Sequence, residues 1–228
     1  MDHLTFLKQT VLFGNLPDTD LAQIGQNMVD RHYEPGEIIF HEGDPGQLLY
    51  LVKSGSVRIF VNGLDGSETS VILVGHPGQM FGELAVIDGL PRSATAVALV
   101  PTTLCTLDRA AFRQHMRRYP QIALNFMQEL SQRLRYNTLQ MDSFASLDVS
   151  QRLARKLMEL AQTYGQICHN GVTINITLTQ SDLASLVGAT RESINKNLRD
   201  FRRQQWIHMD QGQITILDPE ALRAQVAS

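Results

Sequence analysis

The densest group of residues that could bind a ligand lies between Phe81 and Ala96. Gly82 permits close approach of the backbone, and a short helix after it would direct free N–H groups outward, which suits an anion. Arg92 can donate two parallel hydrogen bonds to phosphate oxygens, and Ser93 adds a hydroxyl donor. The ionised carboxylate of Glu83 only accepts hydrogen bonds, so it suits a sugar hydroxyl.

One cation, one carboxylate and free N–H groups together fit a nucleotide that has a single phosphate and a ribose hydroxyl. A second interpretation is equally compatible with these residue types. The segment could be a surface turn with an incidental ion pair between Glu83 and Arg92, and such exposed pairs contribute little to stability. The residue types alone leave both interpretations open.

A second group of functional residues follows Thr177. Thr179 can cap a helix over 180–187, and Gly188-Ala189-Thr190 forms a tight turn. Thr190 then caps a helix from Arg191 to about Gln204. A helix, a three-residue turn with glycine and a second helix form the helix-turn-helix arrangement that enters the major groove of DNA. The alternative is a plain helical hairpin.

The second of these helices carries five basic and two acidic residues. Four polar side chains lie on its N-terminal, solvent-facing part: Arg191, Glu192, Asn195 and Lys196. Base edges are read at that position, where arginine or lysine suits guanine and glutamate accepts from cytosine. Three further arginines are better placed for phosphates or for acidic neighbours: Arg199, Arg202 and Arg203. Two short apolar runs after the helix, 206–209 and 213–217, predict a hairpin wing.

Short apolar runs separated by turn residues predict strands before position 108. The clearest runs are 37–40, 48–52, 56–61 and 69–74. Their close, regular spacing favours an antiparallel sandwich or barrel. A short helix over 18–28 precedes them.

Helices are predicted from Arg109 onward, and one of them is unusually long. It runs from Pro120 to about Ala145 without a glycine or an internal proline. A stripe at three- and four-residue steps comprises Ala123, Phe126, Leu130, Arg133, Asn137, Met141 and Phe144. Such a seam favours a two-helix dimer interface, and the alternative is a helix packed on its own domain. Asp148 caps a further helix that ends before Gly165.

Composition excludes several classes of protein. The chain has 228 residues, 43% hydrophobic and 19% charged, which is typical of a folded protein and not of a disordered one. Two distant cysteines exclude a disulfide framework and a four-cysteine metal site. No apolar run is long enough to span a bilayer, and the N-terminus lacks a secretory layout, so we expect a cytoplasmic protein without a membrane partner.

The segment that begins at Phe81 closely resembles the phosphate-binding cassette of cyclic-nucleotide-binding domains. That cassette reads roughly F-G-E-L-A, followed by R-S-A or R-A-A. The resemblance covers about 12–107 and implies that Glu83 binds the ribose 2′-hydroxyl. It implies that Arg92 and Ser93 bind the cyclic phosphate. Backbone N–H groups join them, from Gly82, Glu83, Leu84 and Ala85.

The pattern Arg191-Glu192-x-x-x-Lys196 is similar to the recognition helix of the cyclic AMP receptor protein and FNR family, which has arginine in place of Lys196. The similarity extends over nearly the whole chain. It implies an α+β protein with three parts: a jelly-roll effector domain (1–119), a dimerisation helix (120–147) and a winged helix-turn-helix (148–228). The implied partners are double-stranded DNA, a second copy of the chain and RNA polymerase.

In this family the long helix supplies a cationic residue and two hydroxyl residues to the ligand. Counting back from the junction at Asp148 places them at Arg133, Asn137 and Thr138. Asn137 departs from the pattern, because it carries an amide and not a hydroxyl. An amide both donates and accepts, so it can read adenine or guanine. We expect cyclic AMP as the effector, with cyclic GMP as the alternative, and no metal.

The resemblance implies a ligand-controlled transcription regulator and not an enzyme. One rival is a family member that binds DNA constitutively or senses another effector, such as haem, with a vestigial cassette. The other is a nucleotide hydrolase or kinase fragment, which has no Walker sequence to support it. The net charge of −3 conceals a division between the halves, because residues 1–148 carry −5 and residues 149–228 carry +2. The acidic average is therefore compatible with a DNA-binding face.

Overall fold

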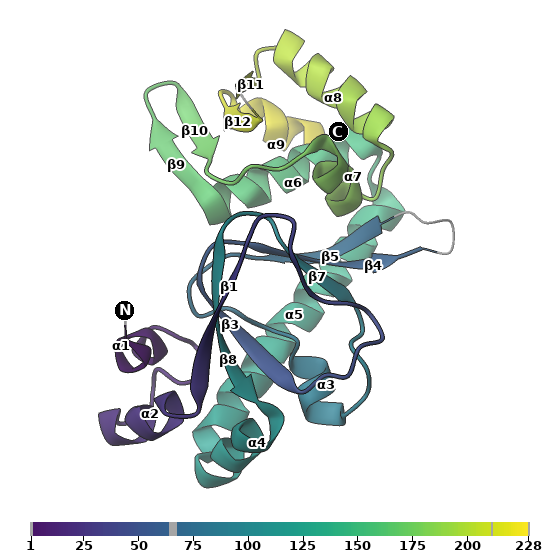
Figure 1. Ribbon diagram of the computed structural model, residues 1–228. Helices are drawn as coiled ribbons and strands as arrows, with labels where there is room; N and C mark the ends of the chain where they lie inside the picture. The colour runs from purple at the N-terminus through teal and green to yellow at the C-terminus, as the bar shows by residue number, and fades with distance from the viewer. Residues whose placement is uncertain (1, 64–67, 211, 228) are drawn as a thin grey trace. The chain divides into compact units, whose positions relative to one another are not determined.

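The computed structural model describes residues 2–63, 68–210 and 212–227. Contacts divide the chain into two compact units (Figure 1). The first takes in the chain up to Asn62 together with Val71–Tyr136, and the second takes in the short segment before Val71 and the chain from Asn137 onward.

Two four-stranded sheets form the first unit. Their strand orders are β1-β8-β3-β6 and β2-β7-β4-β5. The bounds are β1 Met28–Tyr33, β2 Ile38–Phe40, β3 Leu48–Ser54, β4 Val57–Asn62, β5 Glu68–Val74, β6 Met80–Phe81, β7 Thr95–Ala98 and β8 Thr102–Asp108. β8 pairs antiparallel with both β1 and β3, and β7 pairs antiparallel with both β2 and β4. The predicted jelly-roll is confirmed.

Strand β3 separates two hydrophobic cores, because successive side chains of a strand point to opposite faces. Tyr50 and Val52 belong to the core between the two sheets, whereas Leu49 and Leu51 belong to a second core that also contains buried side chains of the helices. A strand that is buried on both faces reads as a continuous apolar run. This burial accounts for the sequence of β3.

The helices of the first unit are α1 His3–Lys8, α2 Asp18–Gly25, α3 Glu83–Asp88 and α4 Arg109–Arg118, and α5 Pro120–Ser146 begins there. Helix α1 was not predicted. The helix predicted over 18–28 ends at Gly25, because Met28 enters β1 opposite Leu107 of β8. Within the described ranges, no helix combines the length and the apolar character needed to cross a membrane.

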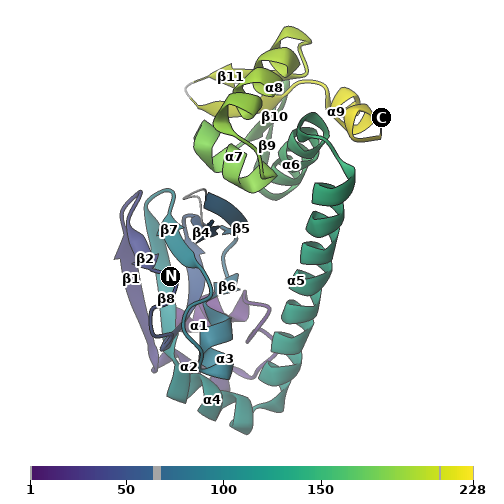
Figure 2. The same ribbon diagram turned by 90° about the vertical axis from the view of Figure 1, so that its right-hand side faces the viewer.

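The long helix α5 is continuous, as predicted (Figure 2). The predicted seam on it is wrong in its first half, because Phe126 is buried in the unit's own core and Leu130 packs against that core. Four of the six large apolar side chains that are exposed on α5 follow a different stripe, which shares Met141 with the predicted seam. They lie at Leu124, Met127, Leu134 and Met141, and the last three are seven residues apart.

The second unit contains four further helices and one sheet. The helices are α6 Val149–Tyr164, α7 Gln180–Val187, α8 Arg191–Arg203 and α9 Pro219–Ala227. The strands are β9 Gly165–Cys168, β10 Gly171–Ile174, β11 Ile207–Asp210 and β12 Gln213–Ile216, in the order β11-β12-β10-β9. The predicted helix-turn-helix and its β11–β12 wing are confirmed, whereas the β9–β10 hairpin and α9 were not predicted.

Candidate functional site

The turn between β6 and α3 depends on Gly82. Its φ is +71°, in the left-handed region that favours glycine. A Cβ at this position would also lie 2.6 Å from Nη1 of Arg92. Glycine therefore allows the turn to close and the guanidinium to lie against the backbone.

Arg92 is buried at this turn. Its Nη1 donates to the carbonyl of Gly82 at 2.6 Å, and its Nη2 donates to the carbonyl of Leu48 at 2.7 Å. The guanidinium carbon lies 4.2 Å from the ring centre of Phe40 and 5.5 Å from that of Tyr50. Burial is the main cause that lowers the pKa of Arg92 from its usual value.

One donor of Arg92 is unused. Its Nε is buried and has no hydrogen-bond partner among the described residues. An unsatisfied buried donor is costly, so it needs an explanation. Two of the five guanidinium N–H groups hold the side chain on carbonyls, and the Nε–H can serve an anion. The residues present therefore fit a phosphate group.

Glu83 is buried in the first turn of α3 and pairs with the long helix. Nη1 of Arg133 lies 3.2 Å from Oε1 of Glu83, and Nε of Arg133 lies 3.2 Å from Oε1 of Glu129. Nη2 of Arg133 donates to the carbonyl of Met80. The sequence placed Glu83 and Arg133 in one site, and the structure brings them together.

The remaining residues of the predicted site differ in their environment. Ser93 and Leu84 are exposed, whereas Ala85 is buried. Asn137 and Thr138 are exposed on α5 and belong to the second unit. Their role toward a ligand stays a prediction.

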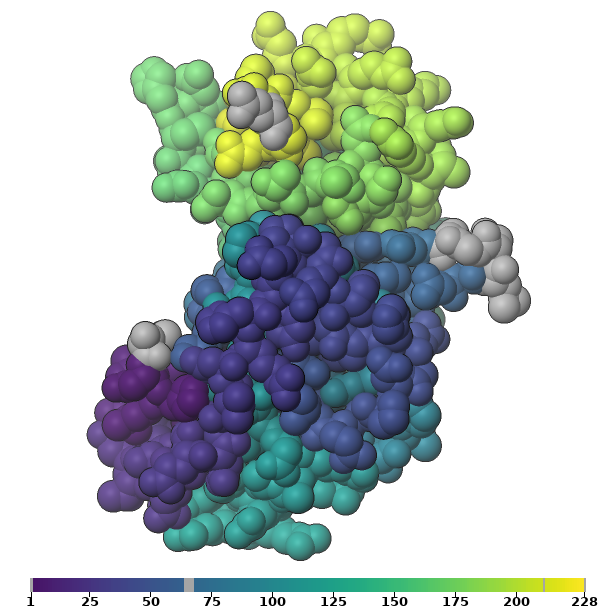
Figure 3. Space-filling view, viewed as in Figure 1, coloured from purple at the N-terminus to yellow at the C-terminus, as the bar shows by residue number. Residues whose placement is uncertain are grey.

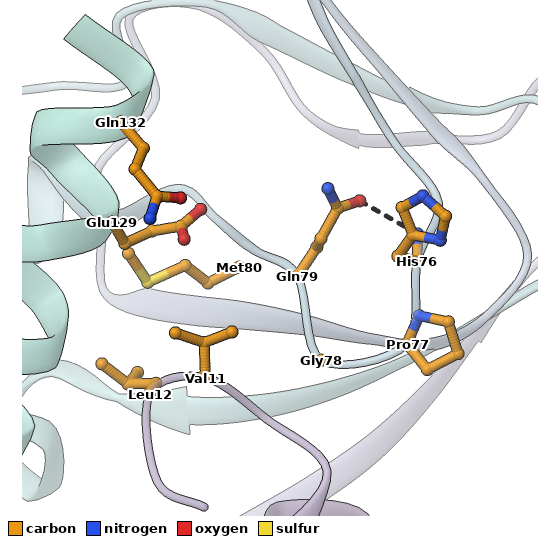
Figure 4. Close-up of a pocket in the computed structure, with 9 residues that line it drawn as sticks. All are labelled: Val11, Leu12, His76, Pro77, Gly78, Gln79, Met80, Glu129 and Gln132. Atoms are coloured by element: carbon orange, nitrogen blue, oxygen red, sulfur yellow. Dashed lines mark hydrogen bonds between the residues drawn. The ribbon is translucent and has the colours of Figure 1, made fainter. Parts of the chain in front are cut away.

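A cavity of about 280 Å³ lies beside Met80 (Figure 4). Glu129 and Gln132 of α5 line it together with the loop from His76 to Met80, and the backbone N–H of His76 donates to Oε1 of Gln79. Among the described residues, its lining includes neither Glu83 nor Arg92. It is therefore separate from the turn that fits a phosphate.

In the second unit, the helix-turn-helix forms as the sequence predicts. Thr179 and Asp182 form a reciprocal capping box at the start of α7. Gly188, with φ +64°, ends this helix, and Thr190 caps α8 by accepting from the N–H of Ser193. The two helices contribute five buried apolar side chains to the core of this unit: Leu183, Leu186, Val187, Ile194 and Leu198.

The opposite face of α8 is polar and open to solvent. Arg191, Glu192, Lys196 and Arg199 are exposed, and Asn195 is half-buried. Nε of Arg199 donates to the carbonyl of Asn195 at 3.3 Å. The predicted base-reading and phosphate-binding residues therefore share one face of the recognition helix.

A junction inside the second unit could not be predicted from the sequence. Arg152 of α6 donates to the carbonyls of Val187 at 2.9 Å, Gly188 at 3.2 Å and Leu147 at 2.7 Å. A Cβ on Gly188 would lie 2.7 Å from the ring of Phe144, in the last turn of α5. The end of the long helix is therefore fixed to the turn of the helix-turn-helix.

Comparison with known proteins identifies both parts. A family model described as "Cyclic nucleotide-binding domain" matches residues 30–119, and one described as "Crp-like helix-turn-helix domain" matches residues 151–225. The "CRP-like cAMP-activated global transcriptional regulator" of Mycobacterium tuberculosis is 32% identical over 95% of this chain and 96% of its own length. The chain belongs to the CRP/FNR family. It is a CRP-like transcription regulator with a cyclic-nucleotide-binding domain and a DNA-binding helix-turn-helix, and it is not an enzyme.

Three further matches show how far the likeness extends. The cyclic AMP receptor protein of Thermus thermophilus is also 32% identical, over 95% of this chain and 96% of its own length. The structure of the catabolite activator protein of the same organism matches with a TM-score of 0.55 and 31% identity, over 96% of this chain and 99% of that one. The regulator CLP of Xanthomonas campestris matches in fold with a TM-score of 0.77 and 24% identity, over 88% and 99%.

Proposed function

We propose that cyclic AMP, bound at the turn before α3, controls DNA recognition by this CRP/FNR-family regulator. The observation that carries the proposal is the buried, unpartnered Nε of Arg92 beside the buried carboxylate of Glu83. In the complex, Arg92 and Ser93 bind the cyclic phosphate with the backbone N–H groups of residues 82–85. Glu83 accepts a hydrogen bond from the ribose 2′-hydroxyl. An ionised carboxylate accepts well from a hydroxyl, whereas a negatively charged phosphate oxygen would repel it.

The base contacts come from α5. Arg133 lies at the turn already, and Asn137 and Thr138 follow it by one helical turn. The amide of Asn137 can accept from the adenine amino group and donate to a ring nitrogen. The regulators of M. tuberculosis and T. thermophilus are named for cyclic AMP, which supports adenine over guanine.

Control of DNA binding is a population shift in the long helix. A nucleotide that engages Arg133, Asn137 and Thr138 favours one arrangement of α5 over another. Phe144 and Arg152 join the end of this helix to the turn at Gly188. A change at that end therefore reaches the recognition helix through direct contacts.

The active species is a homodimer in this proposal, with a domain division at 1–119, 120–147 and 148–228. Leu124, Met127, Leu134 and Met141 form an exposed apolar stripe, and the last three have heptad spacing, which favours pairing with a second copy of the helix. In this dimer the two α8 helices bind half-sites about 34 Å apart, one turn of DNA, so the operator has two-fold symmetry. Bound to DNA, the dimer then contacts RNA polymerase.

Isothermal titration of the whole protein with cyclic AMP and cyclic GMP tests the proposal. We expect saturable binding of cyclic AMP at one site per chain and weaker binding of cyclic GMP. Fluorescence anisotropy then compares DNA affinity with and without the nucleotide, on a duplex selected by the protein from random sequence. Tighter binding of cyclic GMP would reverse the base assignment. DNA affinity that neither nucleotide changes would identify a constitutive regulator and contradict the proposal.

A further inference from the structure

Three side chains with different ligand atoms converge where α1 meets the sheet. His3 of α1, Asp30 of β1 and Cys105 of β8 each offer one such atom, and these atoms lie within 4.8 Å of one another. In Figure 1, α1 lies beside the sheet that contains β1. We propose that this cluster binds a thiophilic metal ion, zinc, through one nitrogen, one oxygen and one sulfur.

The sheet register brings two of these ligands together. Asp30 is the direct antiparallel partner of Cys105, so their side chains leave the sheet on the same face. His3 reaches the same place from α1, with its Nε2 at 2.9 Å from Oδ1 of Asp30. Residues that are far apart in the sequence therefore form one compact group.

The imidazole of His3 is oriented as a metal ligand. Its Nδ1 lies 3.0 Å from the carbonyl of Gly25, which can only accept, so Nδ1 carries a proton. A ligand histidine usually donates its other ring N–H to such an acceptor, which fixes its orientation. The proton shared between Nε2 and Oδ1 of Asp30 is the one that a metal ion replaces. Tetrahedral zinc holds ligand atoms about 3.3–3.8 Å apart, so this contact opens by less than about 1 Å.

Lys53 holds the other oxygen of the carboxylate. Its Nζ lies 2.6 Å from Oδ2 of Asp30, which leaves Oδ1 for the ion. This ammonium opposes ions that bind by charge alone, and calcium or magnesium needs several oxygen ligands. A cluster with one carboxylate, one imidazole and one thiol instead matches the ligands of zinc.

Sulfur gives the cluster its selectivity. Cys105 is fully buried, and burial raises the pKa of its thiol to about 12. Coordination by a metal ion releases this proton to solvent, because the thiolate is the ligand. Sδ of Met28 lies 3.4 Å from Sγ of Cys105 and adds a second soft atom beside the thiol.

An ion can reach the cluster from solvent. The side chains of His3 and Asp30 are 27% and 34% exposed, although Cys105 is closed off. The N-terminal helices lie on the surface of their unit (Figure 3). The fourth coordination position thus faces water, and the bound ion joins α1 to β1 and β8.

Cobalt(II) titration of the metal-free, reduced whole protein tests this site, since thiolate ligation gives cobalt a near-ultraviolet charge-transfer band. We expect the band to reach its full intensity at one cobalt ion per chain, and added zinc to abolish it by displacing cobalt. Cys105→Ser abolishes the band, and His3→Gln weakens cobalt affinity by more than about tenfold, because even indirect partners of a metal contribute that much. His3 is partly exposed, so this second variant tests the ligand set without emptying the core.

Cys168 provides the matched control. It is the other cysteine, exposed on β9 and next to His169. Cys168→Ser leaves the band unchanged if the cluster is the site. A band that survives Cys105→Ser and disappears with Cys168→Ser, an affinity unchanged by His3→Gln, or no band at all would overturn the proposal. None of these results depends on nucleotide binding.

Discussion

Arg133 and Glu83 form an ion pair at the start of α3, with Nη1 of Arg133 at 3.2 Å from Oε1 of Glu83. Both side chains are largely shielded from solvent, and Arg133 is also bound to Glu129 and to the carbonyl of Met80. A carboxylate has about four acceptor positions on its two oxygens. Glu83 can therefore keep Arg133 on Oε1 and accept a ribose hydroxyl on Oε2. The pair connects the turn directly to the long helix.

Replacement of Glu83 tests whether its carboxylate binds the ribose hydroxyl as well as Arg133. Hydrogen bonds to charged groups contribute about 1.5–3 kcal/mol, so Glu83→Ala raises the Kd for cyclic AMP by about ten- to hundredfold in calorimetry. 2′-Deoxy-cyclic AMP lacks the donor, so the wild-type protein binds it weakly and the substitution adds little further loss. If both nucleotides lose the same affinity, Glu83 does not bind the 2′-hydroxyl.

Arg92→Leu removes the proposed phosphate ligand. We expect the Kd for cyclic AMP to rise by about ten- to hundredfold, because the charge-assisted hydrogen bond from the Nε–H is lost and such bonds contribute about 1.5–3 kcal/mol. Arg58→Leu is the matched control, since Arg58 is also buried and lies 4.3 Å from the ring centre of Phe60 in the same domain. Both variants lose buried contacts, and thermal unfolding measures the loss of stability that they share. Equal nucleotide affinity in the two variants would contradict the assignment of Arg92.

Arg152→Gln separates nucleotide binding from the response on DNA. The side chain joins α6 to the carbonyls of Val187 and Gly188, away from the predicted ligand contacts. Affinity for cyclic AMP alone should stay within about twofold, whereas the ratio of DNA affinities with and without the nucleotide should fall several-fold, since coupling energies are about 1–3 kcal/mol. Arg155 lies on the same helix and is paired with Glu159, so Arg155→Gln should leave this ratio of DNA affinities unchanged. Loss of the ratio in both variants would indicate a general loss of stability.

The antiparallel strands, the helix-turn-helix and the turn at Gly82 could be predicted because local signals determine them, whereas the jelly-roll followed from the resemblance to a family. Glycine at φ +71°, the cap at Thr179 and the continuous apolar run of β3 all act within a few residues. The seam of α5 could not be assigned in the same way. Phe126 and Met127 are adjacent apolar residues, and only tertiary packing buries Phe126 and leaves Met127 exposed.

Contacts between distant segments left no signal in the sequence. Asp30 and Cys105 meet because β1 pairs with β8 in one particular register, and a shift by one residue would separate them. Arg152 reads as an ordinary charge on an amphipathic helix, yet it donates to carbonyls at the end of α7. Such partners follow from the fold, and residue spacing does not reveal them.

Two substitutions on α8 separate base reading from phosphate binding. Lys196→Ala should cost about 1–3 kcal/mol on the preferred duplex and relax the preference at one base pair. Arg199→Ala should weaken all duplexes alike and reduce the slope of log affinity against log salt by about one. Anisotropy titrations at several salt concentrations, on the preferred duplex and on single-base variants, measure both effects. A uniform loss from Lys196→Ala would assign that side chain to a phosphate.

Leu134→Glu tests the exposed stripe on α5 as the dimer interface. Leu134 is 68% exposed and lies seven residues from both Met127 and Met141. A carboxylate at this position would be placed opposite its copy in a parallel seam, where like charges and buried charge both disfavour association. Sedimentation velocity should show a dimer for the wild-type protein and a monomer for this variant. Leu139→Glu is the control, because Leu139 is 53% exposed on the same helix but lies outside the stripe. A monomer from both variants, or from neither, would place the dimer contact elsewhere.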